Sequence, residues 1–206
     1  MRDLTIPISD QVIRSLHVGD TVTLSGVLAT GRDTVHKWMI ETFIRETREP
    51  EGDDLEVYEA IKPILNGSLI YHCGPVVAGL DTGDYRFVAA GPTTSIREEP
   101  YQSEVMHHFN LKGVIGKGGM AEKTLQACAD VPAAYFHAIG GAATLIAESV
   151  EEVLTVYKLD FGVPEAIWVL KVDKFPVVVT MDSHGKSIHD DVEAESKAAL
   201  EKLLAA

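Results

Sequence analysis

Apolar and polar side chains alternate in residues 20–30, and this period of two predicts a β-strand. Several short apolar runs follow, and each of them ends in glycine. They span residues 67–74, 85–91, 112–116 and 133–141. Strands that open into tight glycine-rich loops at their C-terminal ends are a favoured place for ligand sites. Two later apolar runs, residues 167–172 and 176–182, predict two further strands.

Helical periodicity is found in the segments between these runs. Asp33 is placed to cap a helix with one apolar face, formed by Val35, Trp38, Met39 and Phe43. Ser9 is placed to cap a short helix over residues 10–16. Two more helices are predicted for residues 121–130 and 141–150. Residues 190–206 predict an amphipathic C-terminal helix, with Glu early and Lys late.

The order of the elements predicts an α/β fold with a mixed sheet. Strands and helices alternate, but an early hairpin-like region argues against a purely doubly wound sheet. The acidic stretch over residues 48–60 is expected to form a solvated loop. Because no repeat or internal boundary is visible, residues 1–206 are expected to form a single domain.

Composition narrows the class of protein and of partner. The chain is 46% hydrophobic and 24% charged, as in an ordinary globular protein. Its formal net charge of −13 argues against nucleic-acid binding, because an acidic surface repels phosphates. No run approaches the roughly 18 apolar residues of a membrane span, and residues 1–11 lack the apolar core of a signal peptide. We therefore expect a cytoplasmic protein that binds neither membrane nor nucleic acid.

Cys73 and Cys128 are the two cysteines of the chain, and they are far apart in sequence. An iron–sulfur cluster usually needs three or four thiolates, so these two residues cannot hold one alone. Buried, reduced thiols are the favoured interpretation of both. No metal ligand is assigned in this chain.

Three glycine loops carry the cations that an anion site would need in so acidic a protein. Residues 30–36 contain Arg32, residues 91–97 contain Thr93 and Arg97, and residues 116–119 contain Lys117. Glycine lets backbone N–H groups approach a ligand, and arginine grips a carboxylate through two hydrogen bonds. Each loop alone could be a surface turn, and the phosphate-loop pattern is absent. Together the loops predict a cage for a small dianion.

Several histidines lie near these loops, and the residues alone do not fix their roles. His36 follows Arg32 by one helical turn, so ligand contact and packing are equally open. His72 and His137 lie at predicted strand ends, where a structural role is favoured. His107 and His108 are expected on the surface of a helix. No G-x-S-x-G elbow indicates a hydrolase.

Taken in order, these segments resemble the C-terminal domain, or separate β subunit, of class I iron–sulfur fumarases and the related tartrate dehydratases. The resemblance spans most of the chain. Its motifs are PISDQVIRSLHVGDTVTLSG, TGRDTVHK, YHCGPVV, GPTTSIR, IGKGGM, YFHAIGGAA, GVPEAIWVLKV and MDSHG. The specific part is GPTTSIR followed by GKGGM, because the two motifs are separated as in the family.

This resemblance implies a swivelling β/β/α domain and half of an active site. A partner α subunit would hold a [4Fe–4S] cluster on its own cysteines, and the open iron would act as a Lewis acid. The assembly would be α2β2 and active only when both chains are present. The reaction implied is the reversible trans addition of water to fumarate, which gives (S)-malate.

The functional positions of the family carry over to matching residues here. Arg32, Arg97 and Lys117 match cations that hold the substrate carboxylates, and Thr93 matches the proposed catalytic base. A threonine hydroxyl is too weak an acid to act unaided. It would need the nearby cations and a carboxylate from the α chain.

Asp33 matches the acidic residue beside the family's arginine and is expected to orient it, with His36 as a second orienting candidate. Glu98 replaces a methionine that is common in the family, and it would weaken anion binding unless it points away. TGRD replaces the commoner TARD, a small change that glycine should tolerate. Two alternatives stay open. They are the β subunit of L-tartrate dehydratase and a non-catalytic module that binds a small diacid, although HAIGGAA is closer to the fumarase form.

Overall fold

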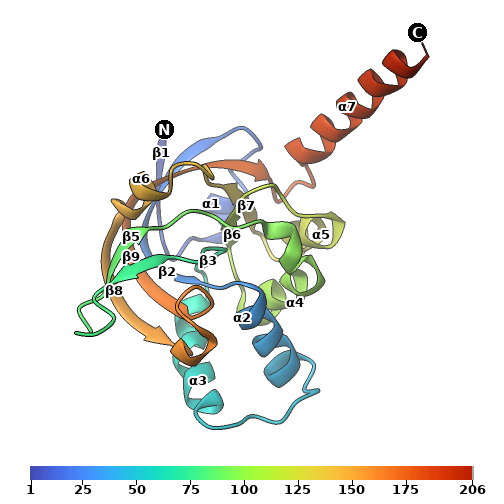
Figure 1. Ribbon diagram of the computed structural model, residues 1–206. Coiled ribbons are helices and arrows are strands. Elements are labelled where there is room, and N and C mark those ends of the chain that lie inside the picture. The colour runs from blue at the N-terminus through green and yellow to red at the C-terminus, as the bar shows by residue number, and fades with distance from the viewer. Residues whose placement is uncertain (206) are drawn as a thin grey trace.

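Seven strands form the main sheet in the computed structural model of the chain, which describes residues 1–205 (Figure 1). Their order in the sheet is β1-β2-β3-β6-β7-β9-β8, and β4 pairs only with β5 in a small second sheet. The strands are β1 (Arg2–Thr5), β2 (Thr21–Thr30), β3 (Leu69–Tyr71), β4 (Val76–Ala78), β5 (Arg86–Ala89), β6 (Gly113–Gly116), β7 (Ala134–His137), β8 (Val150–Tyr157) and β9 (Ile167–Met181).

The sheet is mixed, which confirms the predicted class. Strands β1, β2, β3, β6 and β7 pair in parallel, whereas β9 runs antiparallel to β2, β7 and β8. Because β9 pairs with both β7 and β2, these strands close into a ring with β3 and β6. The C-terminal ends of β2, β3, β6 and β7 therefore lie at one edge of the sheet, where ligand sites are favoured.

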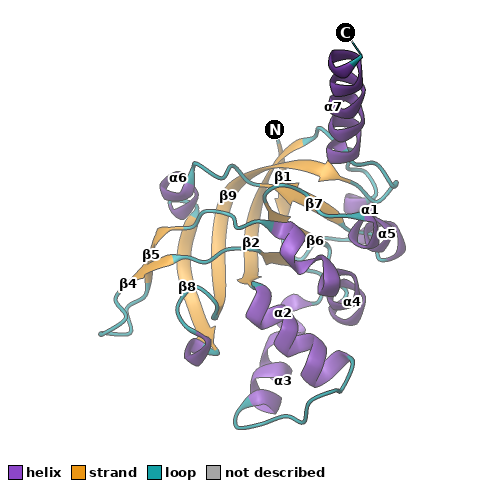
Figure 2. Cartoon of the chain, turned by 45° about the vertical axis from the view of Figure 1, so that its right-hand side comes forward, coloured by secondary structure: helices purple, strands orange, loops and turns teal. Residues whose placement is uncertain are grey.

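Helices cover the sheet and leave one helix free of it. They are α1 (Asp10–Ile13), α2 (Asp33–Met39), α3 (Asp54–Leu65), α4 (Glu99–Phe109), α5 (Glu122–Asp130), α6 (Ala143–Ala147) and α7 (Ile188–Leu204). Helices α2 to α5 pack against the sheet around one hydrophobic core. This core includes Trp38, Ile61, Met106 and Leu125. A second core includes Phe87 of β5, Phe136 and Trp168, and Figure 2 shows β4, β5 and α6 at some distance from α2 to α5.

The acidic stretch over residues 48–60 was expected to be a loop, and this prediction is wrong from residue 54 onward. Helix α3 begins at Asp54 and buries Val57, Ile61 and Leu65, which recur every fourth residue. The side chain of Asp54 is buried as well and accepts a hydrogen bond from Trp38 Nε1 at 2.9 Å. Long-range partners thus stabilise a helix that its acidic composition concealed.

Two other predicted elements differ in length. The two strands predicted for residues 167–172 and 176–182 form one strand, β9, which ends at Met181 and contains Lys174 with φ 50°. Helix α6 has five residues instead of the ten predicted. The lengths of such elements depend on pairing with other strands, which a local pattern does not contain.

Helices are present where they were predicted near the two ends of the chain, but α1 ends at Ile13 instead of residue 16, and residue 206 of the predicted C-terminal helix lies outside the described residues. The two helices differ in their packing. Ser9 caps α1 by accepting a hydrogen bond from the backbone N–H of Val12. Helix α7 is amphipathic but has no buried residue, and it projects away from the sheet (Figures 1 and 2). Within residues 1–205, no helix is long and apolar enough to cross a bilayer.

Candidate active site

The three cation-bearing loops meet at the C-terminal edge of the parallel strands. The loop over residues 91–97 lies between the ends of β3 and β6. Thr93 N–H donates to the carbonyl of His72 at 2.7 Å, and Ser95 N–H donates to the carbonyl of Lys117 at 3.1 Å. Lys117 N–H returns a hydrogen bond to the Thr93 carbonyl at 3.3 Å. The backbone therefore fixes Thr93 and Lys117 next to each other, although they are far apart in sequence.

Arg32 is the N-cap residue of α2, and its guanidinium turns back toward the start of β9. Its Nη1 lies 3.1 Å from Glu165 Oε1, and the other oxygen of Glu165 accepts from Thr34 N–H at 3.2 Å. A Cβ at Gly74 would collide with Nη1, so glycine at this position leaves room for the Arg32 side chain where it now lies. Nε of Arg32 is buried without a partner in the described chain and is free to donate. Glu165 was not predicted from the sequence.

Asp33 was predicted to cap α2, and this is wrong, because Arg32 occupies the cap position and Asp33 is the first helical residue. Its carboxylate instead accepts a hydrogen bond from Arg97 Nη2 and forms an ion pair with it. The orienting role expected of Asp33 stays a prediction. The contact nevertheless joins the first and second loops.

Glu98 points into the protein, away from the face where Arg97 is exposed. Glu98 is 1% exposed, and its carboxyl is within hydrogen-bonding reach of Asp33. Burial, and then the neighbouring Asp33, raise the pKa of Glu98 to about 9. Burial would also raise the pKa of Asp33, but hydrogen bonds from Glu98 and the charge of Arg97 hold that pKa below its ordinary value. A pKa raised in this way favours the neutral form of Glu98, which adds no negative charge to the site.

Thr93 and Lys117 are the least engaged of the predicted residues. Oγ1 of Thr93 is buried and has no hydrogen-bond partner in the described chain. The stem of Lys117 lies over Gly140, where a Cβ would be 3.3 Å from its Cδ. Among residues 1–205, Lys117 has no ion pair, in contrast to Arg32 and Arg97. An unpaired ammonium beside an unpartnered hydroxyl suits the capture of an anion.

A buried chain of hydrogen bonds supports the loops from below. His36 Nδ1 lies 3.0 Å from the carbonyl of Arg32, and its Nε2 lies 3.0 Å from Gln102. His72 Nε2 also contacts Gln102, at 2.8 Å, and its Nδ1 contacts Ser95 Oγ at 2.8 Å. His36 is buried and thus packs rather than faces solvent. The sequence indicated the two histidines but not Gln102, the residue that joins them.

The protonation of this chain follows from its geometry. Burial lowers the pKa of His36 and lowers that of His72 to about 3, so both are neutral at pH 7. His36 Nδ1 faces a carbonyl and must donate, which leaves its Nε2 as an acceptor. Both Nε2 atoms face the Gln102 oxygen, while the Gln102 nitrogen has no partner in the described chain. Exchanging the amide oxygen and nitrogen removes the conflict, and Gln102 then donates to both imidazoles.

The two thiols of the chain do not fit an iron–sulfur cluster. Cys73 and Cys128 are buried in separate hydrophobic cores. Burial raises the pKa of each thiol to about 12, so neither is a thiolate at neutral pH. Within residues 1–205, no group of three or more His, Cys, Asp or Glu side chains is placed to hold a metal ion.

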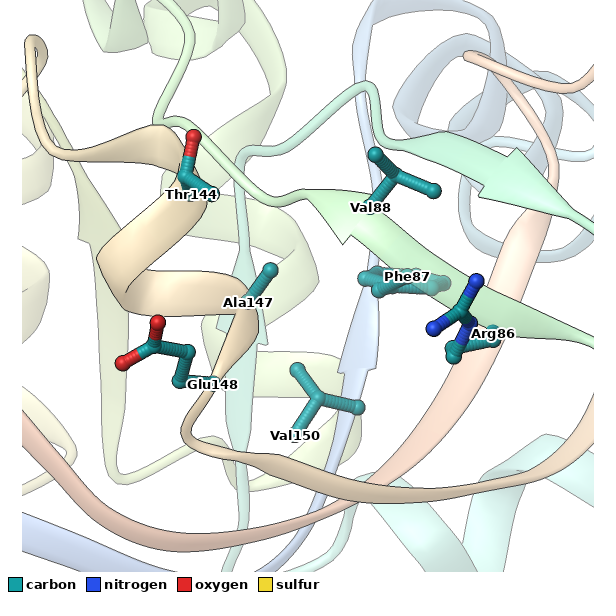
Figure 3. A pocket seen from close by; sticks show the side chains of 7 residues that line it. All are labelled: Arg86, Phe87, Val88, Thr144, Ala147, Glu148 and Val150. Carbon is teal, nitrogen blue, oxygen red and sulfur yellow. The ribbon is translucent and has the colours of Figure 1, made fainter.

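Three further histidines and a hollow remain to be placed, and of these His137 is the strand partner of Gly116, the first residue of the third loop. His137, at the end of β7, is half-buried, and its ring centre lies 6.3 Å from that of His189. His107 and His108 are exposed on α4, as predicted. A hollow of about 330 Å³ between β5 and α6 (Figure 3) is lined by Arg86, Phe87, Val88, Thr144, Ala147, Glu148 and Val150. It contains none of the predicted site residues.

Comparison with known proteins gives this arrangement a context. The family model described as "Fumarase C-terminus" matches residues 2–192. The chain is 47% identical over 201 residues to a protein of Geobacillus stearothermophilus named "Putative fumarate hydratase class I", a match that covers 97% of this chain and 35% of that protein. It is 36% identical over 187 residues to the L(+)-tartrate dehydratase subunit beta of Escherichia coli K12, which covers 90% and 85%. The chain thus spans about a third of the first relative and most of the second.

Proposed function

This chain belongs to the fumarase C-terminus family, and from that membership we propose that it is the β subunit of a two-subunit fumarate hydratase. The proposed reaction is the reversible addition of water to fumarate, which gives (S)-malate. One observation carries the proposal. The loops that bear Arg32, Arg97 and Lys117 meet at one edge of the sheet, and the Arg97 loop also carries Thr93, whose buried hydroxyl has no partner within residues 1–205.

In this proposal, Arg32, Arg97 and Lys117 hold the two carboxylates of the substrate. Both arginines already have a carboxylate neighbour, Glu165 and Asp33 respectively. A guanidinium has five N–H donors, so one such neighbour fixes its direction and leaves donors for a ligand. Lys117 has no such neighbour in the described chain and contributes its full charge. These two ion pairs therefore fix the orientation of the arginines, but each carboxylate cancels one positive charge.

Thr93 is proposed as the base that exchanges a proton with the substrate carbon. The alkoxide form of a threonine is very costly in water, and nearby cations reduce that cost. The backbone of Lys117 is held beside Thr93, because Lys117 N–H donates to the Thr93 carbonyl and Ser95 N–H donates to the Lys117 carbonyl. Arg97 follows four residues after Thr93 in the same loop. A carboxylate from the α subunit would complete the base. Asp33 and His36 are proposed to orient Arg97 and the backbone of Arg32.

The proposed cofactor is a [4Fe–4S] cluster on the α subunit, in a cytoplasmic α2β2 assembly. Two observations support placing the cluster outside this chain. Its two thiols are buried, protonated and in separate cores. The relative from G. stearothermophilus extends well beyond the part that this chain matches, which is compatible with a separate second chain here.

L-Tartrate is the alternative substrate, with the same chemistry and one more hydroxyl group. The match to the E. coli tartrate dehydratase subunit beta favours it, since that relative is covered over 85% of its length. The longer match at 47% identity favours fumarate. The cation cage suits both substrates, because both are dicarboxylates.

The test is reconstitution from separate chains. We expect this chain alone to hydrate no fumarate, and a mixture with the cluster-loaded α subunit to do so, with the α subunit alone as the control. Turnover of L-tartrate by the same mixture, faster than turnover of fumarate, would assign the alternative substrate. Robust fumarate hydration by this chain alone would contradict the divided site. A mixture that binds malate but turns over neither substrate would indicate a non-catalytic binding module.

A further inference from the structure

One buried carboxyl group has no part in the proposed mechanism. Glu98 follows Arg97 in the 3-10 turn Ser95–Glu98, and the two side chains differ in their exposure. The Arg97 side chain is 55% exposed, whereas residue Glu98 is 1% exposed. An ionised carboxylate is rarely buried without a cation or several hydrogen bonds. Its place at the back of the proposed clamp therefore needs an explanation.

The surroundings of Glu98 contain an acid but no cation in direct contact among the described residues. Asp33, at the start of α2, is within hydrogen-bonding reach. Arg97 acts on Glu98 through its charge, but its hydrogen bond goes to Asp33. Burial, and to a smaller extent the charge of Glu98, raise the pKa of the Tyr135 phenol on β7. The hydroxyl of Tyr135 donates a hydrogen bond to Ser95 at 2.8 Å.

The two carboxyl groups are complementary if they hold one proton between them. Asp33 Oδ1 and Glu98 Oε2 are both buried, and neither has a donor in the described chain when both groups are ionised. A proton on Glu98 would let its carboxyl donate a hydrogen bond to the Asp33 carboxylate, which gives both buried groups a partner. Two ionised carboxylates this close in a dry site would repel each other strongly.

We propose that Glu98 is a positioning residue, which keeps its proton at neutral pH and donates a hydrogen bond to Asp33, so that Asp33 holds Arg97 ready for the substrate. The description of Arg97 as a clamp rests on the proposed function, but the shared proton does not. With Glu98 neutral, Asp33 and Arg97 sum to zero charge. With Glu98 ionised, the group would carry one negative charge beside a dianionic substrate.

The arrangement depends on pH in a defined direction. The pKa of Glu98 is about 9, so the shared proton is present at neutral pH and is lost in alkaline solution. Loss of that proton places a second negative charge behind Arg97, and binding of a dianion weakens. The group that titrates is buried, so exposed acids of the chain do not reproduce this behaviour.

The first experiment follows the proton itself. The chain is labelled with ¹³C at the glutamate carboxyls, and NMR follows each signal with pH; Glu98→Gln identifies the signal of Glu98. We expect that signal to titrate well above neutral pH. The control is Glu104, whose carboxylate pairs with Arg45 and whose pKa is lowered by that hydrogen bond. A midpoint for Glu98 in the ordinary glutamate range would overturn the shared proton.

The second experiment measures the affinity of L-malate for the complex with the α subunit, as a function of pH. Glu98→Gln keeps a donor toward Asp33, so we expect near-native affinity at pH 7 and no alkaline loss. Glu98→Leu removes the donor and should weaken malate binding roughly tenfold at pH 7, the effect of one hydrogen bond to a charged group. Equal affinity for all three proteins at every pH would overturn the positioning role. A complex that binds no malate would contradict the proposed function, while the NMR titration would still decide whether the proton is shared.

Discussion

Two charged clusters of this chain are built in opposite ways. Around Asp54, every hydrogen-bonding position of a buried carboxylate is used. Oδ1 accepts from Trp38 at 2.9 Å and Lys158 at 2.5 Å, and Oδ2 accepts from Arg48 at 2.8 Å and Glu51 N–H at 2.9 Å. At the loop site, buried polar atoms lack partners within residues 1–205. They are Nε of Arg32 and Oγ1 of Thr93, whereas Oδ1 of Asp33 and Oε2 of Glu98 lack a partner only if Asp33 and Glu98 do not share a proton.

The difference distinguishes a structural use of charge from a binding use. A buried atom without a partner costs free energy, so a cluster that serves stability alone is expected to satisfy all of its atoms. The Asp54 cluster does so and ties α3 to Lys158 and to Trp38 of α2. The loop site keeps unused donors and acceptors that a ligand or a partner chain could engage. This contrast favours a binding role for the loops before any relative is considered.

The largest effect is expected at Thr93. Thr93→Val keeps the shape of the side chain and removes the hydroxyl, so turnover of the complex should fall roughly a thousandfold, as for loss of a general base. Binding of L-malate should change little, because the cations remain. The measurement is kcat together with malate affinity in the reconstituted complex.

Thr94→Val is the matched control, because Thr94 is the exposed neighbour in the same loop. It should retain turnover close to the native value. If Thr93→Val lost binding and turnover together, Thr93 would have a binding or folding role instead of a catalytic one. If it lost neither, the unpartnered hydroxyl would have no part in the reaction.

The second effect concerns the stability of the saturated cluster. Asp54→Asn removes the charge that faces both Lys158 and Arg48, and Lys158 is only 7% exposed. Breaking a buried ion pair from one side should lower the free energy of unfolding by about 3 kcal/mol. Urea denaturation measures this loss. The neighbouring Asp53 also pairs with Lys158 at 2.5 Å, but its side chain is 59% exposed, so Asp53→Asn should cost under about 1 kcal/mol.

The same variant changes the stability of the chain in acid. Burial alone would raise the pKa of Asp54, but hydrogen bonds from Lys158, Glu51 N–H and Trp38 lower it from 3.8 to about 2. A depressed pKa in the folded state stabilises the fold above the unfolded value of 3.8, and this stabilisation is lost as the pH falls through about 2. Asp54→Asn should therefore show less loss of stability between these two pH values. Equal acid sensitivity in both proteins would show that other carboxylates dominate.

The loops were predictable from the sequence, whereas their neighbours were not. Glycine at the ends of apolar runs marked the strand ends, and the cations of those loops do come together. Glu165 was missed although it stands in the quoted motif GVPEAIWVLKV, because its partner Arg32 lies more than a hundred residues away. A short pattern reports the local backbone, but ion pairs between distant segments depend on the closure of the sheet.

The same limit explains the wrong prediction for residues 54–60 and the question that the sequence left open at Glu98. Residues 54–60 are rich in acids, and only the contacts of Asp54 with Trp38 and Lys158 reveal why a helix begins there. Glu98 was noted as a departure from the family, but its burial against Asp33 required the fold. A sequence shows where the carboxyl groups are but not which of them keep their protons, because protonation depends on the surroundings of each group in the fold.

The smallest effect is expected at Gln102, a buried residue beneath the loop site. If the Gln102 amide donates to His36 and His72, as their geometry requires, then Gln102→Glu removes both donors. The carboxylate would face two imidazole nitrogens that carry no hydrogen, and the free energy of unfolding should fall by about 2 kcal/mol. Gln102→Met, which leaves both nitrogens without a partner but adds no charge, is the matched variant and should cost less.

Nitrogen-15 NMR of the histidine rings gives an independent measurement. Both His36 and His72 should carry their proton on Nδ1 in the native chain, because Nδ1 of His36 faces the Arg32 carbonyl and Nε2 of His72 accepts from the Gln102 amide. The opposite amide orientation would place protons on both Nε2 atoms, and a carboxylate at position 102 would then accept a hydrogen bond from each of them. Native stability of Gln102→Glu together with Nε2–H signals would thus reverse the assignment. It would also make His36 a poor donor to Arg32, and the link between this buried chain and the first cation loop would be lost.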